Sequence, residues 1–296
     1  MSSPASDVRG PIRPRISPWV PLALPAGLLS LVLIGSIGVL LPFSFFAFEQ
    51  GRMVEVLGLS SWARTLGDSF FWGILGRTLQ LALLVTALDL LIGFPTAYAI
   101  TKVRNPVILI LAYGALFSPL VVSIVVRSYG WLFLLSDSGV VNSLLQQLGI
   151  TSAPIHLIYS VIGVQIAMVH GFLPLMVFPL MGVIRQLPVT YKEAALDLGA
   201  NRIQTFLRVV LPLTLPGIIA GCQIVFVLAV ASYVTPELMG GGRVIVASRL
   251  AWESVSYLDW PRGAIQVFIL LGSTGVFILG TNILARRTHL GKLPLG

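Results

Sequence analysis

Six long apolar segments, separated by polar or Gly- and Pro-rich stretches, dominate the pattern of hydrophobic positions along the chain. A helix needs about 20 mostly apolar residues to cross the hydrocarbon core of a bilayer, and each segment meets that length. The pattern therefore predicts an all-α membrane protein with about six transmembrane helices. We place them roughly at residues 19–46, 72–100, 107–135, 156–184, 209–236 and 263–284.

The stretches between these segments leave no room for a second folded unit, because none is long enough for a separate soluble domain. We expect one transmembrane domain over residues 19–285, an N-terminal tail over residues 1–18 and a C-terminal tail over residues 286–296. Small residues let membrane helices approach closely. The segments carry glycines suited to such contacts, namely Gly73, Gly76, Gly217, Gly221, Gly272 and Gly275.

Composition and charge narrow the class of protein further. Apolar residues make up 56% of the 296 positions and charged residues only 10%, whereas soluble domains carry about 25% charged residues. This excludes an ordinary soluble enzyme and a disordered chain. The net charge of +8 comes from scattered basic residues that are not interleaved with aromatic ones, so no nucleic-acid partner is expected. Most lysines and arginines fall on the side of the N-terminus, which predicts that both termini are cytoplasmic.

The polar stretch between the fourth and fifth segments is patterned like two short helices. Thr190 and Glu193 have the spacing of a capping box, and the sequence that follows favours a helix as far as Gly199, where a left-handed turn would end it. Asn201 and Gln204 repeat the capping pattern for a second helix that runs into Pro212. We therefore expect a helix, a turn and another helix on the cytoplasmic side.

The same stretch carries a resemblance to a known family. Glu193-Ala194-Ala195 is followed after three residues by Gly199, and after nine more by Val209-Val210-Leu211-Pro212. This resembles the EAA loop of ABC-importer permeases, E-A-A-x3-G-x9-I-x-L-P, with Val209 in place of Ile. The resemblance implies a type I ABC importer permease (MetI-like) fold, in which the loop at about 185–212 forms a cytoplasmic coupling helix that docks on the ATPase. An alternative is that Glu193 only caps its own helix.

The residues that the resemblance assigns to ATPase coupling are Glu193, Ala194, Ala195, Leu198, Gly199, Leu211 and Pro212.

A second resemblance covers more of the chain. Four stretches, at residues 127–131, 139–145, 235–242 and 260–264, are similar to the spermidine/putrescine permease branch. The resemblance implies a bacterial inner-membrane subunit of an ATP-driven importer for a small polar solute, polyamine-like in character. Its implied partners are a second homologous permease subunit, an ATPase dimer that binds ATP and Mg, an extracytoplasmic solute-binding protein, and membrane lipids.

The chain itself lacks the residues of an enzyme. None of its three lysines is followed by Ser or Thr, so no phosphate-binding P-loop exists. His156, His170 and His289 lie far apart and outside metal-ligand spacing, which favours a His170 that is hydrogen-bonded inside the helix bundle over a metal ligand. We expect a non-catalytic subunit with no catalytic residues, metal or cofactor of its own.

Two charged residues inside the apolar segments are candidates for the transport path. Asp89 lies near the middle of the second segment and Arg127 in the outer part of the third. Charges within spans are costly and usually face a cavity or a partner. They either line or gate the path, or form a structural ion pair or interhelical hydrogen bond.

Aromatic and acidic residues near the outer boundary are further candidates. Tyr129 and Trp131 follow Arg127, and aromatic residues there serve as interfacial anchors or contact a cationic solute. Tyr233 and Glu237 flank Pro236, which is expected to break the fifth helix beside Gly240–Gly242 and to form part of an outer gate.

One alternative function remains at this stage, a stand-alone secondary transporter or channel driven by an ion gradient. No inverted repeat or pair of broken helices supports it.

Overall fold

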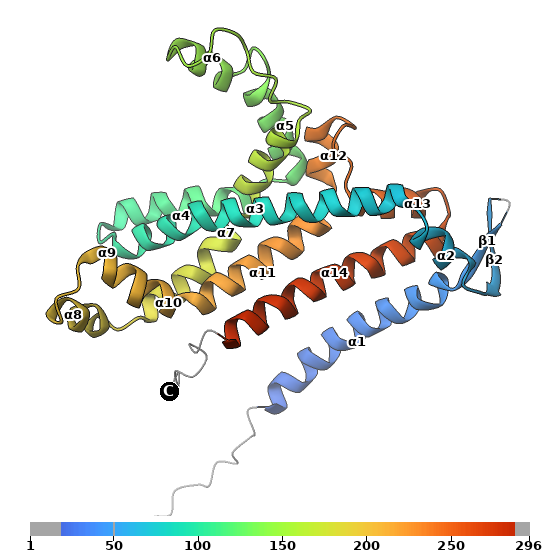
Figure 1. The fold of residues 1–296 in the computed structure, drawn as a ribbon, viewed down its shortest axis with the longest axis horizontal. Helices are drawn as coiled ribbons and strands as arrows, with labels where there is room; N and C mark the ends of the chain where they lie inside the picture. The colour runs from blue at the N-terminus through green and yellow to red at the C-terminus, as the bar shows by residue number, and fades with distance from the viewer. Residues whose placement is uncertain (1–18, 50, 288–296) are drawn as a thin grey trace, which may run out of the picture.

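The computed structural model describes residues 19–49 and 51–287. Within them five helices are long and apolar enough to cross a membrane, or six if one bent pair counts as a single span. Figure 1 shows the long helices running roughly side by side. The N-terminal tail predicted at residues 1–18, and all but the first two residues of the C-terminal tail predicted at 286–296, lie outside the described residues.

Four predicted spans are continuous helices: α1 (Trp19–Ser44), α3 (Ser69–Lys102), α7 (Val161–Gln186) and α14 (Trp260–Arg287). The Asp68 carboxylate starts α3 by accepting a hydrogen bond from the Phe70 N–H at 3.0 Å. The fourth span starts later than predicted because Tyr159 has a positive φ of 53° and Ser160 caps α7.

The third span is not the single helix that was predicted. It consists of α4 (Pro106–Val121) and α5 (Ile124–Leu135), separated by Val122 and Ser123, whose ψ angles of 132° and 138° are extended. The segment formed by α5 and α6 (Val140–Gln147) leaves the line of α4 and projects from the bundle (Figure 1). The break was invisible in the hydropathy pattern because apolar residues occupy both sides of it.

The fifth span is broken at both ends. Its parts are α9 (Arg202–Thr205), the π-helical η1 (Phe206–Val210), α10 (Leu211–Leu213), α11 (Leu215–Ala231) and α12 (Val234–Gly240). The chain bends by 61° between Leu213 and Leu215. The prediction that Pro236 breaks this span was wrong: α11 already ends at Ala231, before Ser232 with its extended ψ of 127°, and Pro236 sits in the first turn of α12, where a missing N–H is tolerated.

Several short elements were not predicted. They are an antiparallel hairpin of β1 (Phe46–Glu49) and β2 (Arg52–Leu57), and the helices α2 (Ser60–Leu66) and α13 (Ala247–Ser256). The hairpin pairs Phe48 with Met53 and Glu49 with Arg52, and Gly51 has the positive φ of 77° that a tight turn favours. Only Val54-Glu55-Val56 alternates as a half-buried strand does, so the sequence signal for the hairpin was weak.

The core is formed where α3, α7 and α11 pack against one another. Gly217 and Gly221 of α11 make the close approach possible, because a Cβ at Gly221 would lie 2.7 Å from the Met176 Sδ of α7. The prediction of close packing is confirmed at these two glycines. At Gly73, Gly76, Gly272 and Gly275 a Cβ would meet no described atom within 4 Å, so these four face open space in the chain as described.

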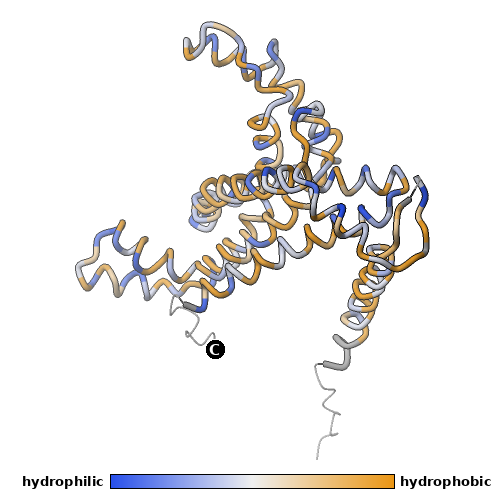
Figure 2. Tube along the Cα trace, turned by 45° about the vertical axis from the view of Figure 1, so that its right-hand side comes forward, coloured by the Kyte–Doolittle hydropathy of each residue, from blue (hydrophilic) through white to orange (hydrophobic). Residues whose placement is uncertain are grey.

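Hydrophilic positions gather toward the two ends of the bundle, while the helices between them are apolar (Figure 2). One end carries α8 (Val189–Asp197) and α9, and we call it the α8–α9 end. The opposite end carries the hairpin, α2 and α13, and we call it the α2–α13 end (Figure 1).

Candidate functional site

The helix α8 begins two residues earlier than the sequence pattern predicted. Its N-terminal flank is Pro188, with φ of −59° and ψ of 134°, and no side chain caps the first turn. The predicted capping box of Thr190 and Glu193 is therefore wrong. Thr190 already lies inside the helix, because the fixed φ of Pro188 leads the chain directly into a turn that starts at Val189.

The turn after α8 matches the prediction closely. Gly199 has φ of +85°, its N–H donates to the Leu196 carbonyl at 2.9 Å, and the Ala200 N–H donates to the Ala195 carbonyl at 3.0 Å. This pair of bonds is a Schellman motif, which satisfies the last carbonyls of α8 and requires a left-handed residue at Gly199. The structure thus gives α8 a fixed end that does not depend on a partner.

The second capping box is confirmed. The Asn201 side chain accepts from the Gln204 N–H at 2.8 Å, and the Gln204 side chain accepts from the Asn201 N–H at 3.0 Å. The short helix α9 is consequently ordered by its own residues before it passes into η1.

Most of the surface of α8 is exposed. None of its residues is buried, and Leu198, at the turn, is 89% exposed. The Glu193 carboxylate makes no hydrogen bond or ion pair within the described part of the chain, so the alternative that it only caps its own helix is not supported. The exposed apolar side chain of Leu198 and the unpaired carboxylate of Glu193 are typical of a contact surface for another protein.

The segment that follows links α8 to the bundle. Leu211 and Pro212 form α10, at the 61° bend, and Leu211 packs against the main core. Phe206 of η1 packs edge-on against Phe94 and Tyr98 of α3, with ring centroids 5.6 and 6.0 Å apart. Phe206 therefore joins the segment that follows α9 directly to the core helix α3. Sequence reasoning missed Phe206, which no motif distinguishes from an ordinary apolar residue.

Asp89 and Arg127 lie in different surroundings. Asp89 is fully buried in α3, and neither of its carboxylate oxygens has a hydrogen-bond partner among the described residues. Arg127 donates to the Pro119 carbonyl of α4 and packs against Gly171 of α7, where a Cβ would lie 2.7 Å from its guanidinium. The alternative of an ion pair between the two is wrong for the described chain, whereas an interhelical hydrogen bond is confirmed for Arg127.

The aromatic candidates after Arg127 divide between the interior and the surface. Trp131 donates from its Nε1 to the Nδ1 of His170 at 3.2 Å, while Tyr129 is 59% exposed. The prediction of a hydrogen-bonded His170 inside the bundle is confirmed. Among the described residues no group of three or more His, Cys, Asp or Glu side chains has a geometry that could hold a metal ion.

Tyr233 and Glu237 both contact α13. The Tyr233 ring stacks on Trp252, with centroids 5.9 Å apart and the planes 14° from parallel. Glu237 forms an ion pair with Arg249 at 2.7 Å, and Arg249 also pairs with Glu253 at 2.9 Å. The two candidates thus hold α12 and α13 together at one side of the bundle.

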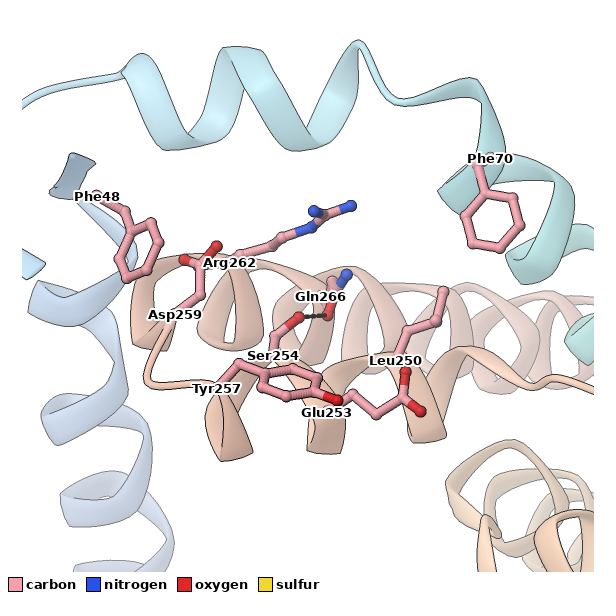
Figure 3. Close-up of a pocket in the computed structure, with 9 residues that line it drawn as sticks. All are labelled: Phe48, Phe70, Leu250, Glu253, Ser254, Tyr257, Asp259, Arg262 and Gln266. Carbon is pink, nitrogen blue, oxygen red and sulfur yellow. Dashed lines mark hydrogen bonds between the residues drawn. The ribbon is translucent and has the colours of Figure 1, made fainter. Parts of the chain in front are cut away.

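A polar cavity of about 410 Å³ lies at the α2–α13 end, and Figure 3 shows its lining. Ser254 donates to the Gln266 side chain at 3.0 Å. Asp259, at the rim, pairs with Arg64 at 2.9 Å, and Arg262 pairs with Asp68 at 2.5 Å. These ion pairs were not predicted. The sequence feature that could have indicated them is an acidic residue directly before each of α3 and α14, together with Arg262 in the first turn of α14.

Comparison with known proteins decides the family. Residues 39–289 match the model of the binding-protein-dependent transport system inner membrane component. The chain belongs to this family. It is 34% identical over 238 residues to the spermidine/putrescine transport system permease protein PotB of Escherichia coli (strain K12), covering 80% of this chain and 86% of that protein. It is 30% identical over 247 residues to the inner membrane ABC transporter permease protein YdcU of the same organism, covering 79% of each.

A solved structure supports the fold. A chain of a bacterial alginate ABC transporter, crystallised in complex with an alginate pentasaccharide-bound periplasmic protein, superposes with a TM-score of 0.66 at 19% identity, covering 91% of this chain and 95% of that one. The chain is therefore a multi-pass inner membrane protein, the non-catalytic permease component of a binding-protein-dependent ABC importer, and ATP binding lies in a separate ATPase subunit. The stand-alone secondary transporter is set aside.

Proposed function

We propose that this permease imports a small polycationic solute of the polyamine class, delivered by an extracytoplasmic binding protein. The similarity to PotB over most of both chains supports this substrate class. We further propose that the translocation path forms between this chain and a second, homologous permease subunit, and that an ATPase dimer drives it. Surrounding membrane lipids complete the assembly, and no nucleic acid takes part.

We propose that the α8–α9 end, together with both chain termini, faces the cytoplasm. The distribution of charge supports this orientation. The α8–α9 end collects basic residues with few acids, whereas at the α2–α13 end acids pair with arginines. Cytoplasmic loops of membrane proteins carry such an excess of Lys and Arg.

The observation that carries the mechanism is the exposed helix α8, ended by the left-handed Gly199. We propose that the ATPase receives α8 through Glu193, Ala194, Ala195 and Leu198, and that closure of the ATPase displaces it. Leu211 and Pro212, at the bend, together with the Phe206 contact to α3, carry that displacement to the spans.

We propose that Asp89, Arg127, Tyr129, Trp131, Tyr233 and Glu237 line the substrate path or its outer gate. Carboxylates and aromatic faces suit a cationic solute. In the described conformation, Asp89 is buried and Glu237 is paired with Arg249.

Replacing Gly199 with Val tests the coupling role. A β-branched residue is strained at φ of +85°, so the Schellman turn must rearrange and displace Leu198. We expect uptake of labelled spermidine by cells to fall at least tenfold and the ATPase to be lost during purification of the permease. Asp197→Asn, two positions away on the exposed helix, is the control and should retain both. Normal uptake and normal co-purification in Gly199→Val would overturn the coupling role.

A further inference from the structure

A second cavity lies at the α8–α9 end, between the end of α3 and the two helices of the coupling stretch. Its volume is about 530 Å³. Tyr98 and Lys102 line it from α3, Lys192 from α8, and Arg202 and Thr205 from α9. The cavity therefore lies between α8, which we propose contacts the ATPase, and the core helix α3.

The lining of this cavity carries an excess of positive charge. Three basic side chains face one acid, Glu193, and none of these four charged groups forms an ion pair within the described residues. The Nζ atoms of Lys102 and Lys192 lie 5.2 and 5.6 Å from the centroid of the same Tyr98 ring. Two ammonium groups thus lie near one ring with no paired counter-ion among the described groups, an arrangement that favours an anion in the cavity.

An unpartnered hydroxyl gives an independent indication. Thr205 is only 6% exposed, it lines the cavity, and its Oγ1 has no hydrogen-bond partner among the described residues. A buried hydroxyl without a partner is destabilising, so such groups in proteins generally meet a ligand, a water or another polar atom. The first turn of α8, whose Val189 also lines the cavity, has neither a side-chain cap nor an acidic residue.

We propose that this cavity binds a phosphate group, supplied either by the headgroup of an anionic phospholipid or by a soluble phosphate. A phosphate offers several acceptor oxygens with delocalised charge, which matches ammonium and guanidinium donors around one hydroxyl donor. Bound there, it holds α8 against the end of α3. Binding stands on the cavity alone, while the consequence of holding α8 in place rests on the proposed coupling role of α8.

The experiment uses the complete importer in nanodiscs of phosphatidylcholine, with or without phosphatidylglycerol, and with or without inorganic phosphate. Retained phosphatidylglycerol is counted by native mass spectrometry, and inorganic phosphate is followed by ³¹P NMR. We expect Lys102→Gln combined with Lys192→Gln to lower the affinity for the bound anion at least tenfold. Thr205→Val, which keeps the side-chain shape, should weaken binding about tenfold, because it removes a hydrogen bond to a charged group.

The matched control is Arg104→Gln combined with Arg208→Gln. It removes the same charge at the same end from positions that do not line the cavity, and it should bind the anion as the wild type does. Retention of phosphatidylglycerol identifies the lipid as the source, and a signal with inorganic phosphate alone identifies a soluble anion. Equal binding by the cavity variants and the control overturns the proposal.

Binding of both anions by the permease alone but not by the complete importer also overturns the proposal, because the ATPase would then occupy the cavity. The two roles of this region fail separately. If Gly199→Val loses uptake but the wild-type importer binds no anion, the coupling role stands and only the anion site is overturned. If the wild-type importer binds the anion but Gly199→Val keeps normal uptake, the anion site stands and the coupling role is overturned.

Discussion

Asp89 illustrates, at the scale of a single residue, what the sequence can and cannot predict. Its position inside an apolar segment was enough to single it out as costly. Its surroundings were not predictable, because they depend on which face of α3 meets α7 and α11. The structure buries it fully and leaves both carboxylate oxygens without a partner among the described residues.

Replacing Asp89 with Leu separates a structural role from a transport role. Removing a buried polar group that lacks partners relieves its desolvation cost, which mutational data place at about 1–3 kcal/mol. We expect the apparent Tm of the detergent-purified permease to rise or stay unchanged while spermidine uptake falls at least tenfold. Asp89→Glu, which keeps the carboxyl group, should recover part of the uptake.

Two results would contradict this view of Asp89. A clear fall in Tm for Asp89→Leu would mean that the carboxyl makes a stabilising contact in the folded protein. Uptake at the wild-type level by a normally assembled importer would remove Asp89 from the transport path and leave it as a tolerated interior polar group.

At the scale of helices, the sequence predicted the elements whose signals are local. The box of Asn201 and Gln204 was recognisable because both halves of the reciprocal cap lie within four residues. Thr190 and Glu193 had the same spacing, yet Pro188 sets the start of α8 instead. Spacing alone therefore indicates that a cap is compatible with the chain, and the backbone of the preceding residue decides whether it forms.

Breaks inside apolar segments were beyond the reach of the hydropathy pattern. Val122 and Ser123 interrupt the third span with extended backbone, although the residues around them are as apolar as those in a continuous helix. Such a break is stabilised by what the two halves contact. Here Arg127 of α5 reaches back to the Pro119 carbonyl of α4, a contact that no local pattern encodes.

The packing of α11 on α7 gives a prediction with a matched control. Gly221→Leu places a side chain where a Cβ already lies 2.7 Å from Met176 Sδ and 3.2 Å from the Met176 carbonyl oxygen. Overpacking of this kind costs about 1–3 kcal/mol, so we expect a lower apparent Tm for the permease purified alone. Gly275→Leu, where a Cβ would meet no described atom within 4 Å, should leave that Tm nearly unchanged. Equal effects would mean that α11 and α7 do not approach as described.

For the whole molecule, the two ends of the bundle are built on different principles. At the α8–α9 end, charged side chains such as Glu193 and Lys102 remain without ion pairs among the described residues, as expected of a surface that receives partners. At the α2–α13 end, acids and arginines neutralise one another across elements far apart in the sequence. Arg64 pairs with Asp259 and Asp68 with Arg262, which joins α2, α3 and α14.

Asp259 ties this end together, and its loss has a predictable size. It pairs with Arg64, and its carboxylate also accepts from the Arg262 N–H at 3.2 Å in the first turn of α14. Loss of a helix cap costs about 0.5–2 kcal/mol, and a partly exposed pair adds up to about 1 kcal/mol at low salt. We expect Asp259→Ala to lower the apparent Tm of the purified permease. The Tm difference from the wild type should become smaller at high salt, because salt screens the ion pair but not the helix cap.

The control is Arg243→Gln. Arg243 is exposed, lies in the same half of the bundle and forms no ion pair among the described residues, so the substitution should change neither the Tm nor its salt dependence. A difference in Tm that is the same at low and high salt would show that Asp259 acts through the cap alone.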